Sequence, residues 1–382
     1  MTLRFGQSLL ALCTILSALG PVSAFAGECK VKEPTLEAIA DAIKIGVVLD
    51  VQMAIVAADY YKKTGKQLKV ALIARAGQNM KDILTLRDTD AQGRYQTAQQ
   101  MTINAEYEVP MNEAGGRDVE KVKQYIRKTY GDKRHQSVYS HIGMVFWNHP
   151  DGVTPDGKRQ WYFRHMLRPC VTGDEVKTGI NPNLPQLFDE GILRFFADDP
   201  YELRAQILVP TDDIQENLEK LALPKTVVID GKEYEDNRLP QIFKGEFYNA
   251  AAAWNNKVEA NSNQYILELV AAASQPYGRV TTRAEAQDVL AKTGFRPMRA
   301  MLSGTQAMAS LPFAGKLAPY VRVHYEEQPA YANYAIADLI TTNAVEDYMK
   351  RNNWIMFDRS IYVSDKTVAQ KKEQTNAAQG GQ

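Results

Sequence analysis

The sequence predicts an α+β fold in which an antiparallel sheet packs against helices. Strand-like segments occur at residues 67–77, 135–149 and 159–168. The last two are separated by "NHPDGVTPDGK", a turn-rich stretch that predicts a hairpin. Helical segments form separate runs and do not alternate regularly with the strands. Strands mixed with segregated helices favour α+β over a doubly wound parallel sheet.

The N-terminal residues 1–26 have the layout of a secretory signal peptide. They contain one positive charge, an apolar run over residues 9–19 and the small residues Ala24 and Ala26 at the expected cleavage site. A signal anchor is the alternative, but the run is shorter than the ~20 residues that a spanning helix needs. We therefore expect a periplasmic or secreted protein whose mature chain starts at Gly27 and has no transmembrane segment.

Charge and cysteine content exclude several classes of partner. The chain has 45 Lys and Arg residues against 45 Asp and Glu residues, without a basic stripe, which argues against binding to nucleic acid. Cys29 and Cys170 remain after signal removal, and an oxidising compartment favours a disulfide between them. A free, nucleophilic Cys170 is the alternative. Neither cysteine lies in a Cys-x-x-Cys pair and the five histidines show no ligand spacing, so we expect no metal or other cofactor.

A long helix is predicted between an N-cap at Thr35 and Gly65. Apolar residues recur through it with a helical period, at Leu36, Ile39, Ile43, Val47, Val51, Ile55 and Ala58. The chain then changes to "QLKVALIARAG", residues 67–77, whose β-rich centre predicts a buried strand. Another helix is expected over "LPQLFDEGILRFFADD", residues 184–199.

We expect one α+β domain over residues 27–363, with an insertion at about 85–135 and a disordered tail at 364–382. The insertion is predicted because residues 85–117 are polar, turn-rich and weakly periodic, as in a lid or other excursion from the fold. Residues 118–131, "DVEKVKQYIRKTYG", predict a short helix within it. The tail is polar enough to be disordered.

His141 stands in the middle of the strand-like stretch "HQSVYSHIGMVFWNH". Strand alternation places it on one face with Tyr139, Gly143, Val145 and Trp147. Gly143 leaves space beside the ring, which a strand tolerates poorly unless another group approaches closely. His141 is therefore either a core histidine with a hydrogen-bond partner or part of a ligand site. His165, in the next strand, could lie beside it across the ladder.

A second candidate site is the start of the helix in "VEANSNQYILELVAAAS", residues 258–274. Asn261, Ser262 and Asn263 are the small polar residues that helix N-caps prefer, so capping is one interpretation. A helix N-terminus also offers unpaired N–H groups and a partial positive charge, which can activate a nucleophile or hold an oxyanion.

The order of several sequence blocks resembles DUF2145, a family of bacterial exported proteins. The blocks are "KVALIARAG", "YSHIGMVFW", "LRPC", "LFDEGILRFFADDPYELRAQILVP", "ANSNQYILELVAAA" and "VRVHYEEQPAYANYAIADLITTNAVEDYM". "SHIG" and "GILRFFADDP" are the most specific of them. The resemblance covers most of the mature chain outside the polar insertion, and it implies a fold more than an activity.

A Ser-His-x-Gly strand followed by this helix start also resembles the permuted papain-like hydrolases of the NlpC/P60 superfamily. The resemblance implies a papain-like antiparallel sheet, with His141 as the base and Ser262 at the position of the cysteine nucleophile. The chain departs from the pattern at that serine, and Gln328 in "EEQP" replaces a histidine of relatives. A serine must lose its proton to a base during attack, so His141 would need an orienting group. His165 is the candidate by position.

Two hypotheses of different classes follow. The first is a periplasmic hydrolase or acyltransferase acting on an amide or ester of the cell envelope, with His141 as base and Ser262, or alternatively Cys170, as nucleophile. The second is a catalytically inactive envelope protein that binds a peptide, glycan or lipid in the same cleft. The distance between His141 and the candidate nucleophiles discriminates between them.

Overall fold

The computed structural model of the 382-residue chain describes its residues in several stretches. These are 29–30, 33–77, 84–113, 115–132, 138–147, 161–170, 178–179, 181, 183–198, 202–223, 225–229, 232–236, 241–302, 324 and 328–363. The expected signal segment and the expected disordered tail lie outside the described residues.

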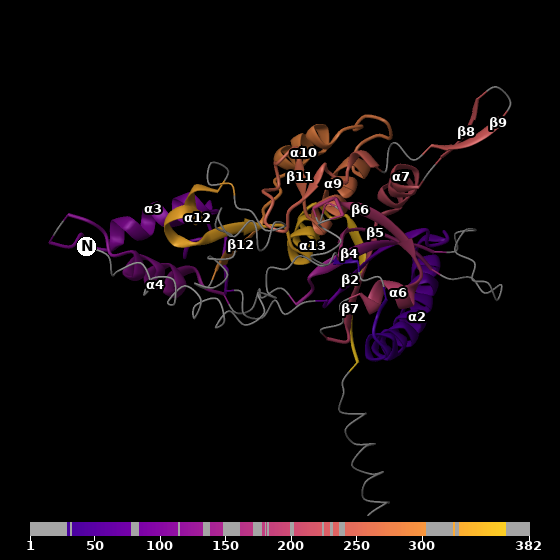
Figure 1. The fold of residues 1–382 in the computed structure, drawn as a ribbon, viewed down its shortest axis with the longest axis horizontal. Coiled ribbons are helices and arrows are strands. Elements are labelled where there is room, and N and C mark those ends of the chain that lie inside the picture. Colours follow the sequence, from indigo (N-terminus) through magenta and orange to yellow (C-terminus); the bar gives the residue numbers. More distant parts are fainter. Residues whose placement is uncertain are drawn as a thin grey trace, which may run out of the picture.

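A mixed sheet forms the centre of the molecule (Figure 1). Its strands run in the order β1-β5-β4-β2-β7-β14, and β6 also pairs with β5. Only β1 pairs in parallel, with β5, and the other pairs of this sheet are antiparallel. The strands are β1 (Cys29–Lys30), β2 (Val70–Arg75), β4 (His141–Phe146), β5 (Tyr162–Pro169), β6 (Gln186–Glu190), β7 (Arg204–Pro210) and β14 (Ile355–Tyr362). The predicted strands, the β4–β5 pairing and the α+β class are confirmed.

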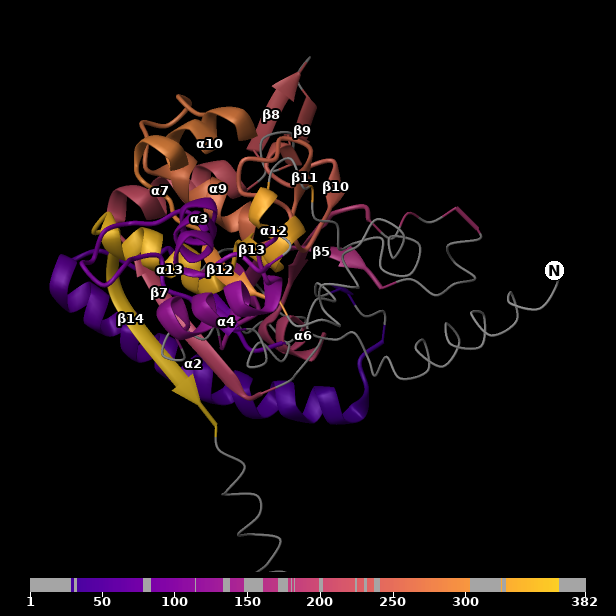
Figure 2. The same cartoon turned by 90° about the vertical axis from the view of Figure 1, so that its left-hand side faces the viewer.

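Helices cover both faces of this sheet (Figures 1 and 2). One face packs on α2 (Leu36–Thr64) and α6 (Ile192–Ala197), in a core that includes Ile73, Val145 and Phe195. The other face packs on α7 (Asp212–Ala222), α9 (Ser262–Ala273) and α13 (Thr342–Arg351), in a core that includes Leu72 and Met144. Helix α10 (Arg283–Lys292) packs against α9 on this second side.

Helix α2 begins and ends where the sequence predicts. The Thr35 side chain accepts a hydrogen bond from the Ala38 N–H at 3.1 Å, and Gly65 ends the helix with a left-handed φ of 71°. The face that contacts the sheet is formed by Ala38, Ala42, Ile45, Gly46, Leu49, Met53, Val56 and Tyr60. The large apolar residues that mark the helical period in the sequence are instead exposed, so α2 is apolar on two sides.

A second, smaller sheet joins the polar segment after β2 to the last third of the chain. Strand β3 (Leu84–Leu86) pairs with β12 (Met298–Met301), which pairs with β13 (Ile336–Leu339). Helices α3 (Ala98–Glu108), α4 (Val119–Tyr130) and α12 (Pro329–Tyr334) share an apolar core with these strands. The predicted helix at 118–131 is confirmed as α4, whereas α3 was not expected. The segment expected as an excursion thus shares a core with residues from the last third of the chain.

The remaining strands are short. The pairs are β8 (Lys225–Ile229) with β9 (Lys232–Asp236), and β10 (Phe247–Tyr248) with β11 (Glu259–Ala260). The β8–β9 hairpin projects from the body of the molecule (Figure 1). Within the described stretches, no helix combines the length and the apolar character needed to cross a membrane.

One disulfide joins the edge strand β1 to the residue that follows β5. Cys29 in β1 is bonded to Cys170, which follows β5. The two cysteines are 141 positions apart in sequence, and their Cα atoms are 5.0 Å apart. The expected disulfide is confirmed. The alternative role of Cys170 as a free nucleophile is excluded in this state, because its sulfur is used in the bond.

We expect loss of this disulfide to destabilise the fold. Cross-linking across so long a loop restricts the unfolded chain, and the variant Cys29→Ser/Cys170→Ser should lose up to about 4 kcal/mol of unfolding free energy. Urea denaturation of the oxidised protein and the variant measures the difference. Two titratable thiols in the denatured, unreduced protein would show that the bond does not form.

Candidate functional site

Two buried histidines and a glutamate form a hydrogen-bonded chain on the α2 side of the sheet. His141 begins β4 and His165 lies in the adjacent strand β5, with His141 Nε2 2.8 Å from His165 Nδ1. The other nitrogen of His165, Nε2, lies 2.7 Å from Glu190 Oε1 at the end of β6. Both rings are completely buried. The structure therefore brings His141 and His165 together and adds Glu190 behind them.

The proton positions in this chain follow from the charge of Glu190. Burial opposes its ionisation, but the hydrogen bond and charge of His165 and the charge of Lys30 outweigh burial and lower its pKa to about 2. An ionised carboxylate only accepts, so His165 Nε2 carries the proton of that bond. The second hydrogen bond of this chain joins His141 Nε2 and His165 Nδ1.

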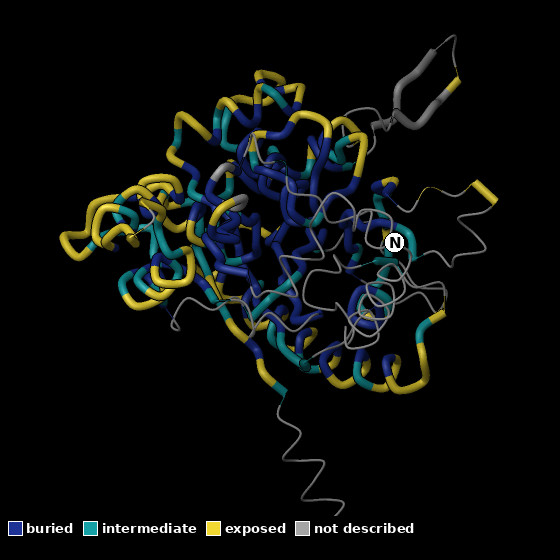
Figure 3. Tube along the Cα trace, turned by 60° about the vertical axis from the view of Figure 1, so that its left-hand side comes forward, coloured by how far each residue is buried: buried dark blue, intermediate teal, exposed yellow. Residues whose placement is uncertain are grey.

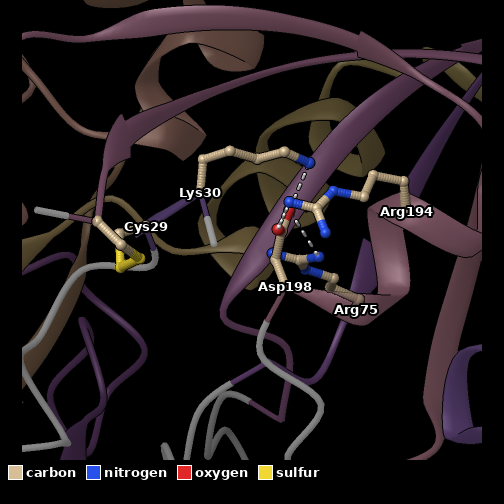
Figure 4. Close-up of a disulfide and its surroundings, with 6 residues drawn as sticks. Cys29, Lys30, Arg75, Arg194 and Asp198 are labelled. Atoms are coloured by element: carbon tan, nitrogen blue, oxygen red, sulfur yellow. Dashed lines mark hydrogen bonds and ion pairs between the residues drawn. A yellow bond between two sulfur atoms is a disulfide. The ribbon is translucent and has the colours of Figure 1, made fainter. Parts of the chain in front are cut away.

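Lys30 places a cation beside the carboxylates next to the hydrogen-bonded histidines, and its approach to Asp198 is drawn in Figure 4. Its Nζ contacts Glu190 Oε2 and lies 3.0 Å from Asp198 Oδ2. Asp198 is also 3.6 Å from Arg194 Nη2 and 4.0 Å from Arg75 Nη1, and its side chain has no exposed surface. The carboxylates are thus compensated by cations of the protein itself, one of which is adjacent in sequence to the disulfide.

This cluster also has the composition of a metal site. His165, Glu190 and Asp198 each offer one ligand atom, and the three atoms lie within 4.8 Å of one another. The Lys30 ammonium, however, contacts both carboxylates. A metal ion would have to displace Lys30 and approach Arg75 and Arg194, whose charges repel it. We therefore assign the cluster as a network of ion pairs.

The space beside His141 is filled by Phe195 of α6. A Cβ atom on Gly143 would lie 2.7 Å from Phe195 Cε2, so only glycine admits the ring at this point. The Phe195 ring centroid is 5.7 Å from that of His141 and 5.1 Å from that of His165. The Arg75 guanidinium lies over the same Phe195 ring, 4.8 Å from its centroid. The close approach expected at Gly143 is therefore confirmed, and the approaching group is a core side chain.

His141 is held neutral by its surroundings. Burial lowers its pKa well below 6.5, and the positive charges of Arg75, His165 and Lys30 lower it further. An imidazole in this setting suits a hydrogen-bonded core histidine, which was one of the two interpretations of the sequence.

Ser262 lies on the opposite side of the sheet from His141. It is the first residue of α9, and that helix packs on the face that carries Ile142 and Met144. Because successive side chains of a strand point to opposite faces, the His141 ring, which contacts Phe195, points away from α9. The expected pairing of His141 with Ser262 is therefore not found in this arrangement.

The polar start of α9 serves the fold. Asn261 is the N-cap, and its Oδ1 accepts from the Gln264 N–H at 2.8 Å. The Nδ2 group of Asn263 donates to the carbonyl oxygens of Ser140 at 3.1 Å and Ile340 at 3.2 Å. These bonds connect α9 to the segments that precede β4 and α13, so the capping interpretation accounts for this motif.

A separate cleft lies between the smaller sheet and α13. Its volume is about 520 Å³. The lining residues are Thr85, Leu86, Arg87, Asp88, Thr89, Asp132, Arg296, Pro297, Met298, Arg299, Asn343, Ala344, Asp347, Lys350 and Arg351. Five of these residues are cationic and three are anionic, so cations dominate the lining.

Two arginines of this cleft are not neutralised by a carboxylate. Arg87 donates to the Thr129 carbonyl oxygen at 2.6 Å, and Arg351 donates to the Asp347 carbonyl oxygen at 3.3 Å. Within the part of the chain that the structure describes, neither has an ion-pair partner. Burial lowers the pKa of Arg351, and the neighbouring Arg296 charge lowers it further. Arg296 itself is paired with Asp88 at 3.1 Å.

Residues 120–349 match the model of the family DUF2145, which is described as an uncharacterized protein conserved in bacteria. The chain belongs to the DUF2145 family. The resemblance seen in the sequence blocks is thus confirmed. The DUF2145 match contains His141, His165, Glu190 and α9, whereas Lys30 and α2 precede it. No curated protein and no solved structure matches the chain.

The sequence did not reveal Glu190, Lys30 or Asp198 as parts of this cluster, and for Glu190 the reason is a wrong secondary-structure prediction. Residues 184–199 were expected to form one helix, but Gln186–Glu190 is strand β6, and a short helix, α6, follows after Gly191. A strand ending in "FDE" beside the His165 strand would have suggested a carboxylate for the histidine. Lys30 has no such signal, since it reaches Glu190 from 160 positions away in sequence.

The low pKa of His141 in the folded state predicts a loss of stability in weak acid. Its pKa in the unfolded chain is near 6.5, so the unfolded state binds the proton first as the pH falls. This contribution to stability is complete above pH 6.5 and decreases below it, by up to about 1.4 kcal/mol at pH 5.5. Urea denaturation at pH 7.5 and 5.5 measures the change.

A His141→Gln variant is the control, because glutamine can still form a hydrogen bond with His165 but does not titrate. We expect its unfolding free energy to be less dependent on pH over this interval. An equal dependence in the wild type and in the variant would mean that another group is responsible.

Proposed function

We propose that this DUF2145 protein is a ligand-binding protein of the bacterial cell envelope and that an anionic ligand occupies the cleft between the smaller sheet and α13. The observation that carries the proposal is the pair of arginines, Arg87 and Arg351, that line this cleft without a carboxylate partner among the described residues.

Electrostatics support an anion at this position. Burial and the Arg296 charge lower the pKa of Arg351, and the charges of Asp347 and Asp88 offset only part of this effect. A carboxylate or phosphate would offset the remainder, and guanidinium groups bind both with paired hydrogen bonds. The cleft is also large enough for a small ligand and lies between two packed units, where binding sites are common.

The sequence hypothesis of an inactive envelope protein placed a peptide, glycan or lipid beside His141 and Ser262. The proposal keeps that class of function but moves the ligand to the arginine-lined cleft, and it requires an acidic group on the ligand. Export to the envelope rests on the sequence of residues 1–26.

A hydrolase or acyltransferase of papain-like type is the second candidate. It is favoured by the chain from His141 through His165 to Glu190, since a base oriented by further hydrogen-bonded groups is the arrangement that activates a nucleophile. Ser262 would have to reach that chain from the other face of the sheet, which ranks this candidate below the binding protein.

Removal of the Arg351 charge should weaken anion binding. The probes are inorganic phosphate, pyrophosphate and citrate, measured by calorimetry on the purified protein. We expect Arg351→Gln and Arg87→Gln each to lower the affinity for the best anion at least tenfold, because a charge-assisted hydrogen bond contributes about 1.5–3 kcal/mol. The matched control is Arg94→Gln, since Arg94 is exposed, paired with Asp90 at 2.8 Å, and outside the cleft. Unchanged affinity in both cleft variants would contradict the proposal.

Serine-directed fluorophosphonate labelling tests the second candidate. We expect the wild type and Ser262→Ala to show the same, background level of labelling, because the Ser262 hydroxyl and the His141 ring belong to different layers of the fold. Labelling that disappears in both Ser262→Ala and His141→Gln would instead establish the hydrolase.

A further inference from the structure

Helix α2 carries a continuous apolar stripe on the side that faces away from the sheet. Its large residues are Leu36, Ile39, Ile43, Val47, Val51 and Ile55, with exposed fractions of 86, 37, 46, 63, 54 and 41 per cent. Ala40, Ala54 and Ala58 are exposed beside them. Figure 3 shows exposed positions along the outer edge of this long helix.

Such a stripe is unusual for a helix at the surface. Surface helices are normally polar on the outer side, and a helix that is apolar all round is normally buried. The exposed parts of the six large residues amount to roughly 500 Å², which is the size of the largest apolar patch on a typical monomer, and such patches are often functional. Among the residues that the structure describes, none covers this stripe.

The part of the stripe from Ile39 to Ile55 is arranged symmetrically about Val47. Four positions to either side are Ile43 and Val51, seven positions away are Ala40 and Ala54, and eight positions away are Ile39 and Ile55. Each pair is alike in polarity and close in size. A two-fold axis beside Val47 would bring each residue of one helix against its counterpart in an antiparallel copy, which is the self-complementarity that an isologous contact needs.

We propose that two copies of this protein associate through α2, with the helices antiparallel and the two-fold axis beside Val47. Burying both stripes removes on the order of 1,000 Å² from water, the lower limit expected for a biological interface. The proposal is independent of the ligand in the arginine-lined cleft. Helix α13 covers the opposite face of the sheet, so the contact leaves that cleft open (Figure 1).

Charge argues for a second copy and against a membrane surface as the occupant. Helices that lie on membranes are rich in Lys and Arg beside the apolar stripe. The charged residues of α2 are Glu37, Asp41, Lys44, Asp50, Asp59, Lys62 and Lys63, which gives no cationic excess. Lys44, the basic residue beside the centre of the stripe, is already paired with Asp41 at 2.6 Å.

Sedimentation equilibrium tests the association on the full chain purified from the periplasm of an expressing bacterium. We expect a dimer for the wild type and at least a 100-fold larger dissociation constant for Val47→Asp, because the variant buries two unpaired carboxylates at the axis. The matched control is Ile103→Asp, since Ile103 is also β-branched and is 51 per cent exposed, but lies in another helix, α3. This variant should dimerise as the wild type does.

Cysteine cross-linking tests the register and does not depend on a charged variant. Val47→Cys should form a disulfide-linked dimer, because the two copies of residue 47 meet at the axis. Ile39→Cys should not, since eight residues of helix at 1.5 Å each separate it from the axis and hold its two copies about 24 Å apart. A mixture of Ile39→Cys and Ile55→Cys should cross-link.

A monomeric wild type at all concentrations would overturn the proposal. So would cross-linking of Ile39→Cys as efficient as that of Val47→Cys, which indicates a parallel or unspecific contact. Co-sedimentation of the monomer with vesicles of phosphatidylglycerol and phosphatidylethanolamine, abolished by Val47→Asp, would identify a lipid surface as the occupant and would equally overturn it.

Discussion

The complete cover of both faces of the central sheet is the constraint on which the rest of this structure depends. Strands β2 and β4 are buried along their whole length, because α2 and α6 cover one face while α7, α9 and α13 cover the other. Alternation then assigns neighbouring residues to different cores. Ile142 packs towards α9, and His141, one residue before it, packs against Phe195 of α6. A histidine and a serine that look complementary in the sequence are separated by the thickness of the sheet.

The same constraint explains why the layer with α6 needs its own charge balance. The side chains of Asp198 and the two histidines have no exposed surface, and an isolated charge in such a place would be strongly destabilising. Lys30 supplies the nearest cation, and β1, which holds it, consists of two residues joined to β5. The disulfide at Cys29 fixes this short strand against β5 and thereby keeps the ammonium next to Glu190. In this setting the disulfide and the ion pairs support one another, and the histidine chain is a product of core packing.

Features that depend on local pattern could be predicted from the sequence, and features that depend on distant pairing could not. The caps of α2, the strands β2, β4 and β5 and the helix α4 each follow from residues within one segment. The proximity of His141 and His165 was also accessible, because a hairpin puts neighbouring strands side by side. By contrast, β3 pairs with β12, which lies more than 200 residues later in the sequence, and no periodicity in either segment predicts that pairing. Gly143 indicates a close approach, but only the tertiary structure shows that the approaching group is Phe195.

The extent of the family match bears on what constitutes the folding unit. Residues 120–349 include β4, β5, β6 and β7 but not β2, and β2 lies between β4 and β7 in the sheet. Without residues 70–75, the edges of β4 and β7 would be left unpaired, and without α2 one apolar face of the sheet would be open to water. Open edges and open apolar faces promote aggregation. The matched segment therefore cannot close the central sheet by itself, and residues before it are an integral part of the same fold.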